Sequence, residues 1–196
     1  MSRLFVFTGT QGVGKTTILN EVIKEYKDMD VITNVVRNLY NNGDIKINKK
    51  GNGKTQQLIY DTLKHKCIDY LYNSSYEDFN TGCICDRSLV DVVAYTKYLY
   101  ERGKASLNSY NEQLKDLKEW AIYHRYGCKY IYIPIEFPAV EDGVRDIDEE
   151  YRKEIDENIK WLLRECNIDY YILEGSVEER VEMMKNIIEF NKRGDQ

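Results

Sequence analysis

A glycine-rich segment near the start of the chain constrains the fold more than any other feature of this sequence. Residues Gly9 to Thr16 (GTQGVGKT) fit the pattern G-x-x-x-x-G-K-[ST] in full. A short apolar run, Leu4 to Phe7, precedes the segment, and apolar residues at helical spacing follow it from Lys15 onward. Glycines at these positions allow a tight turn whose backbone N–H groups point at phosphate oxygens, and the following helix adds the positive end of its dipole. The segment predicts a phosphate-binding loop, and the alternative is a chance glycine turn before a helix.

The polar side chains of this loop predict the ligand. Lys15 is expected to reach the β- and γ-phosphates of ATP, and the Thr16 hydroxyl is expected to hold the Mg²⁺ ion that bridges them. The predicted nucleotide-binding set is Gly9, Thr10, Gln11, Gly12, Val13, Gly14, Lys15, Thr16 and Thr17.

Apolar runs alternate with stretches of helical periodicity along the whole chain, about five of each. This alternation predicts an α/β fold with a parallel five-stranded sheet and helices on both faces. Ligands of such sheets bind beyond the carboxyl ends of the strands. One domain over residues 1–196 is expected, with a loop at 41–54 and an amphipathic helix at 148–165. The predicted strands are 4–7, 31–32, 83–86, 129–135 and 169–173.

Composition and charge exclude several classes of protein. The 196 residues are 42% hydrophobic and 31% charged, which is typical of a folded globular chain. A net charge of −5 argues against a DNA or membrane partner. No apolar stretch approaches the ~18 residues that span a bilayer, and the five cysteines form no C-x-x-C pair. We expect reduced thiols, no membrane partner and a cytoplasmic location, in the host cytoplasm if the protein is viral.

A carboxylate and an arginine follow the third predicted strand. Asp86 stands where a P-loop protein places a second acidic residue for Mg²⁺ or for the attacking group, and Arg87 follows it directly. We predict that Asp86 acts as a base or a metal ligand and that Arg87 contacts the acceptor or a phosphate. The structural alternative is that Asp86 caps the next helix and Arg87 pairs with Asp91.

The segment at about 136–152 has the composition of a short lid. It contains Pro138, Gly143 and Arg145. A cation carried by a closing lid stabilises charge on the transferred phosphoryl group and excludes water. Arg145 is predicted for this catalytic role and Arg152 is the second choice; ordinary surface ion pairs are the alternative.

Other polar residues carry weaker predictions. Arg37, on the expected second helix, is a candidate for binding an acceptor phosphate, as are Arg87 and Arg152, or it is simply solvated. Ser176 and Glu179 have the spacing of a capping box, and their loop could also pack against a base.

Three segments together resemble the NadR-type ATPase/kinase group of P-loop proteins, which includes the ribosylnicotinamide kinase domain and many phage proteins. They are GTQGVGKTT, CDRSLVDVVAY and VEDGVRDIDEEYRKEIDENI. The resemblance implies a P-loop kinase fold, Mg-ATP as donor, a nucleoside- or nucleotide-type acceptor and a phage origin. Asp86 and Arg87 would then face the acceptor, and Arg145 would belong to the lid. Members of the group often carry a glutamate shortly before the position of Arg37, whereas residues 33–36 here are TNVV.

Three functions stay open at this point. The first is ATP-dependent phosphorylation of a nucleoside hydroxyl or a nucleotide phosphate. The second is a kinase acting on hydroxymethylated pyrimidines in DNA, with the Lys-rich residues 45–54 contacting the backbone. The third is a regulatory ATPase without a small-molecule acceptor. The sequence itself does not indicate the oligomeric state; kinases of this build are often homodimers, and only that analogy suggests one here.

Overall fold

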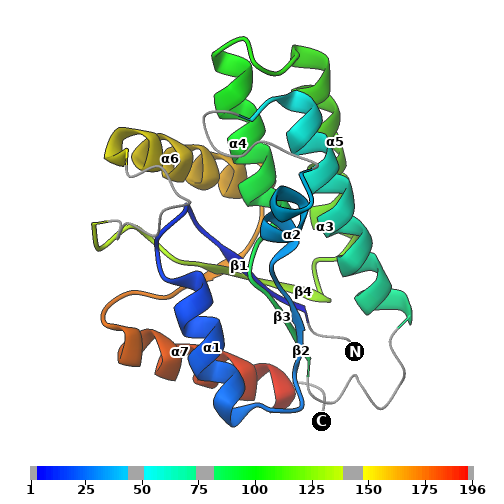
Figure 1. Cartoon of the computed structure of the whole chain (residues 1–196). Coiled ribbons are helices and arrows are strands. Elements are labelled where there is room, and N and C mark those ends of the chain that lie inside the picture. Colours follow the sequence, from blue (N-terminus) through cyan, green and yellow to red (C-terminus); the bar gives the residue numbers. More distant parts are fainter. Residues whose placement is uncertain (1–3, 44–50, 74–81, 139–147, 194–196) are drawn as a thin grey trace.

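Five parallel strands form one sheet in the order β2-β3-β1-β4-β5 (Figure 1). The computed structural model describes residues 4–43, 51–73, 82–138 and 148–193. The strands are β1 Leu4–Thr8, β2 Asp30–Ile32, β3 Cys83–Cys85, β4 Cys128–Tyr132 and β5 Tyr170–Ile172. Only β2 and β5 are edge strands, and the central strand β1 is buried along its whole length. The predicted α/β class and five-stranded parallel sheet are therefore confirmed.

Helices cover both faces of this sheet (Figure 1). Side chains alternate along each strand, so Leu4 and Val6 pack with one helical layer while Phe5 and Phe7 pack with the other. Helices α2, α3, α4, α5 and α6 cover the first face, and α1 and α7 cover the second. Their bounds are α1 Lys15–Glu25, α2 Val35–Asn41, α3 Gly53–Asn73, α4 Leu89–Glu101, α5 Leu107–Tyr123, α6 Glu149–Glu165 and α7 Val177–Arg193.

The parallel register brings three strand ends to one edge of the sheet. Val6 pairs with Cys85 of β3 on one side and with Tyr130 of β4 on the other. The loop after β1, the Asp86–Arg87 pair after β3 and the segment after β4 therefore begin next to one another.

The structure corrects several expected boundaries. It has seven helices within the described residues, where about five were expected, because α3 and α5 had no assignment in the sequence. The fourth strand ends at Tyr132 instead of continuing to 135. Pro134 has no N–H to donate to the ladder, which stops the pairing one residue after Ile133 N–H bonds to the Thr8 carbonyl at 2.8 Å. The loop expected at 41–54 is bounded by α2 and by α3, which already begins at Gly53, and residues 44–50 lie outside the described part.

Two further expectations concern the thiols and the membrane. All five cysteines are buried and free, and burial raises the pKa of the Cys128 thiol to about 12. No helix within the described ranges is long and apolar enough to cross a membrane.

Candidate active site

The loop between β1 and α1 has the conformation that a phosphate site needs. Gly14 is the residue before helix α1 and has a φ of 94°, in the left-handed region that disfavours any side chain. A Cβ on Gly9 would lie 2.6 Å from the carbonyl oxygen of Ile133, the residue after β4. The glycines of the motif are therefore required by one backbone angle and by one close contact.

Lys15 lies against the loop itself. It is 9% exposed, and its Nζ donates hydrogen bonds to the carbonyls of Gly9 at 2.5 Å and Thr10 at 2.7 Å. Thr16 and Thr17 follow on the first turn of α1 and are exposed. The lysine charge is thus held against the loop backbone, and solvent can reach the two threonines that follow Lys15 in the chain.

Two buried arginines contact backbone carbonyls of the same loop. Arg152 of α6 is fully buried and its Nε donates to the carbonyl of Gln11 at 3.1 Å. Arg180 of α7 is 2% exposed and donates to the carbonyl of Val13 at 2.8 Å. Together with Lys15, these cations donate hydrogen bonds to four carbonyl oxygens between Gly9 and Val13.

Each arginine is neutralised close to the loop. Arg152 also donates to Glu149 at 2.5 Å and to the Phe137 carbonyl at 3.2 Å. Arg180 forms an ion pair with Glu136. Residues 136–137, where the expected lid segment begins, therefore contact both arginines.

Asp91 of α4 connects the loop to the helix that follows β3. This fully buried carboxylate accepts hydrogen bonds from Gly9 N–H at 3.0 Å and from the Ser88 hydroxyl at 3.0 Å. Burial raises the pKa of the Asp91 carboxyl, while the nearby Lys15 and Arg87 cations act in the opposite direction. Ser88 and Asp91 form the capping box of α4, so it is Ser88, and not Asp86, that caps this helix.

Asp86 and Arg87 lie at the carboxyl end of β3, beside this cluster. Asp86 is half-buried, and its carboxylate lies 3.5 Å from the backbone nitrogen of Asn34, which precedes α2. The Arg87 guanidinium lies 5.5 Å from the centre of the Tyr95 ring and is close enough to Asp91 to affect its pKa. The structure thus places the Asp86–Arg87 pair at the same edge of the sheet as the loop.

The other predicted residues are placed as follows. Arg37 is an exposed residue of α2, the element that follows β2 at the same edge. Arg145 lies outside the described residues. Ser176 and Glu179 make the two hydrogen bonds of a capping box at the start of α7.

Sequence reasoning missed the roles of Asp91, Arg180 and Glu136. The sequence contains one signal for Asp91 and one for Arg180. Asp91 has capping-box spacing from Ser88, and Arg180 stands four residues before the buried Met184, on the apolar stripe of its helix. Arg152 likewise precedes the buried Ile155 by three residues. A charged residue within an apolar stripe is a signal of a buried, paired group.

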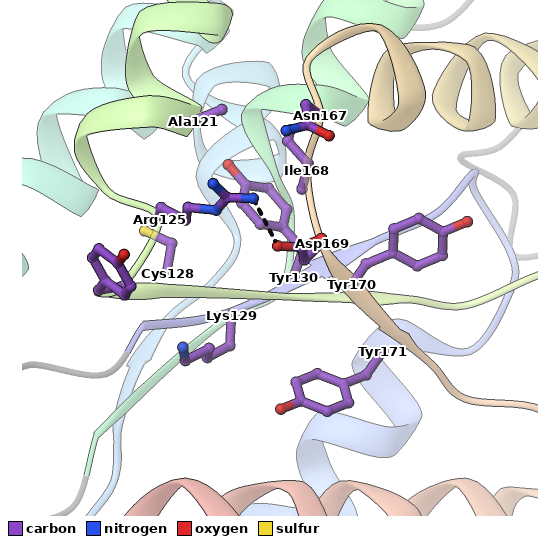
Figure 2. Close-up of a pocket in the computed structure, with 11 residues that line it drawn as sticks. Ala121, Arg125, Cys128, Lys129, Tyr130, Asn167, Ile168, Asp169, Tyr170 and Tyr171 are labelled. Carbon is purple, nitrogen blue, oxygen red and sulfur yellow. Dashed lines mark hydrogen bonds and ion pairs between the residues drawn. The ribbon is translucent and has the colours of Figure 1, made fainter. Parts of the chain in front are cut away.

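A hollow of about 330 Å³ lies elsewhere on the molecule (Figure 2). Its lining includes Cys128 and Lys129 at the start of β4, Asp169 just before β5, and Arg125, which pairs with Asp169 at 3.1 Å. These are the amino ends of the strands, opposite the edge that carries the loop. The hollow is therefore separate from the candidate active site.

A five-stranded parallel sheet with this loop at the carboxyl end of its central strand defines the P-loop kinase-like fold. The model of a protein family described as an AAA domain matches residues 4–180, and the chain belongs to that family. A comparison with curated proteins found no match.

Solved structures share the fold at low sequence identity. A NadR protein in complex with NR is 17% identical with a TM-score of 0.74, and the match covers 97% of this chain and 52% of that one. A deoxyadenosine kinase from M. mycoides is 16% identical with a TM-score of 0.62, covering 95% and 98%. A thymidylate kinase from Candida albicans is 15% identical with a TM-score of 0.61, covering 97% and 92%. The chain thus spans about half the length of the NadR structure.

Proposed function

We propose that this protein transfers the γ-phosphoryl group of Mg-ATP to a nucleoside- or nucleotide-type acceptor. The observation that carries the proposal is the position of Asp86 and Arg87 beside a complete phosphate-binding loop. A loop alone supports nucleotide binding. A carboxylate and an arginine at the adjacent strand end add the groups that a second substrate requires.

The residues present fit both ATP and Mg²⁺. Arg152 and Arg180 hold two loop carbonyls, so the N–H groups of those peptides point away from the arginines, as they would to bind phosphate oxygens. Mg²⁺ in phosphoryl-transfer sites is bound by one or two side-chain oxygens together with phosphates and water. The exposed Thr16 hydroxyl would supply one such oxygen, and the Asp86 carboxylate would supply a second where it does not act as the base. Bound there, the metal neutralises charge on the transferred group.

The chemical role of Asp86 depends on the kind of acceptor. A hydroxyl acceptor needs a base to take its proton, and in the proposal Asp86 is that base. A monophosphate acceptor is already ionised near neutral pH and needs arginines more than a base. In both cases Arg87 and the exposed Arg37 bind the acceptor, and Arg145 closes over the transferred group. The contacts of Arg152 support a role in holding the loop.

The proteins that share the fold support this acceptor class. One NadR structure contains NR, and one structure of the deoxyadenosine kinase contains dCMP and dCDP. These ligands belong to those proteins, and their common chemistry, a ribose or deoxyribose with or without phosphate, is what we propose for this chain.

The test is the rate of ADP release from Mg-ATP, measured with and without acceptor. Nucleosides, including nicotinamide riboside, and nucleoside monophosphates are added as separate pools. We expect at least one pool to raise the rate well above basal hydrolysis. A rate that no acceptor raises would contradict the proposal and favour the regulatory ATPase, and stimulation by hydroxymethylated DNA alone would favour the DNA kinase.

A further inference from the structure

Arg180 links three segments that are far apart in the sequence. Its Nη1 donates to the Val13 carbonyl of the phosphate-binding loop, and its Nη2 pairs with the carboxylate of Glu136, which follows β4. The same Glu136 oxygen accepts a hydrogen bond at 2.9 Å from the N–H of Gly175, which precedes α7. One buried guanidinium thus joins the loop to the ends of β4 and β5.

The contact with Val13 fixes the orientation of a peptide group. The Val13–Gly14 peptide is trans, so its C=O and N–H point in opposite directions. Because Arg180 donates to the Val13 carbonyl, the N–H of Gly14, the residue before α1, points away from Arg180. A charge-assisted hydrogen bond to a buried cation is among the stronger ways to hold such an orientation.

We infer that Arg180 is a positioning residue for phosphate binding, held in place by Glu136. It acts through the loop backbone and makes no contact with the base of the nucleotide. This inference rests on the proposed function, because it needs a polyphosphate in the loop. It goes beyond the proposed function because it states that Arg180, on the last helix, and its partner Glu136 determine how tightly the phosphate chain binds.

The alternative is that Arg180 contacts the base of the bound nucleotide. Its guanidinium lies 5.2 Å from the centre of the Phe137 ring, and Phe137 is half exposed. An arginine and an aromatic ring together could also form a surface on which a base stacks. The two roles differ in one respect: inorganic tripolyphosphate has no base, so only the loop role affects its binding.

The experiment measures the dissociation constants of Mg-ATP and of Mg-tripolyphosphate by titration calorimetry. Wild type, Arg180→Met and Lys15→Met are compared, each with its thermal unfolding midpoint. The matched control is Arg102→Met, because Arg102 also donates to a carboxylate, Glu154, and to a backbone carbonyl, that of Tyr98, but at the far end of α4. Glu136→Gln, at a partly exposed site, provides a second, milder variant that tests the same link if Arg180→Met does not fold.

We expect Arg180→Met to weaken both ligands by the same factor, about 10- to 100-fold, as small misplacements of a site's groups do. Glu136→Gln should weaken both in parallel by a smaller factor, and Arg102→Met should weaken neither. Loss of ATP affinity with unchanged tripolyphosphate affinity would overturn the inference in favour of a base contact, and unchanged affinity for both would overturn it outright. A wild type that binds neither ligand would instead contradict the proposed function.

Discussion

The backbone N–H of Gly9 donates a 3.0 Å hydrogen bond to the carboxylate of Asp91, which lies 82 positions later in the chain. This contact ties the first residue of the phosphate-binding loop to the first turn of α4. The same carboxylate completes the capping box of α4 and lies near the Lys15 and Arg87 cations. Asp91 therefore joins the two halves of the candidate site, the donor loop and the Asp86–Arg87 segment.

Replacing Asp91 by alanine should destabilise the protein by about 3 kcal/mol, because buried cations lose their counter-charge and α4 loses the Asp91 half of its capping box, while the Ser88 cap remains. Urea denaturation measures this loss. The control is Ser106→Ala, which removes a cap from α5 at an exposed position and should cost only about 1 kcal/mol. Equal losses in the two variants would show that Asp91 does no more than cap its helix.

The substitution Gly9→Ala should disrupt the loop. The added Cβ would lie 2.6 Å from the Ile133 carbonyl oxygen, a backbone atom that cannot move without disturbing β4. We expect at least a tenfold loss of ATP affinity, measured by titration calorimetry. Gly103→Ala is the control for backbone strain without a clash, since Gly103 has a φ of 68° and nothing lies within 4 Å of a Cβ at that glycine. Normal ATP binding by Gly9→Ala would contradict the close packing described here.

The substitution Arg145→Ala should lower kcat far more than it weakens ATP binding. The proposed lid contact forms mainly in the transition state, and a group that binds there alone affects turnover and not ground-state affinity. Steady-state kinetics together with an ATP dissociation constant separate the two effects. A parallel loss of both would make Arg145 a ground-state ligand of ATP.

His124 should make stability depend on pH. Burial lowers the pKa of His124 below its ordinary value of 6.5, and its ring stacks on Trp120 with centroids 3.8 Å apart. The cation of Lys64 lowers the pKa further, whereas the hydrogen bond to the Trp120 carbonyl raises it. Since the unfolded chain then binds the proton more readily, this contribution to stability is complete above pH 6.5 and is lost as pH falls through the folded-state pKa.

The measurement is the free energy of unfolding between pH 5 and pH 7.5. His124→Gln should flatten the slope, while His65→Gln, at an exposed site, should keep it. The account of His124 would fail if both variants retained the wild-type slope.

Local sequence patterns predicted the parts of the site that are contiguous in the chain. The GTQGVGKT segment needs only its own glycines and the flanking strand and helix, so its position could be predicted. Asp86 and Arg87 follow a short apolar run directly, and the parallel sheet then places them beside the loop. The sheet could be predicted for the same reason, because each strand is an apolar run between polar turns.

Contacts between distant segments could not be predicted in this way. Arg152 and Arg180 stand in highly charged helices, where an arginine is most often solvated. Which backbone carbonyl each one meets depends on how α6 and α7 pack on opposite faces of the sheet. The helices α3 and α5 were missed although their buried residues have helical spacing, as Tyr110, Leu117 and Trp120 do in α5. Their burial depends on packing against α4.

The most direct test of the proposed kinase activity is to follow the label of γ-labelled ATP into chromatographically resolved products, with Mg²⁺ and a mixture of nucleosides and nucleoside monophosphates. Lys15→Met, shown to be folded by its thermal unfolding curve, is the control. We predict label in a nucleoside- or nucleotide-derived product with the wild type and a loss of more than about a hundredfold in the variant. Label found only in free phosphate, or equal transfer by folded Lys15→Met, would contradict it.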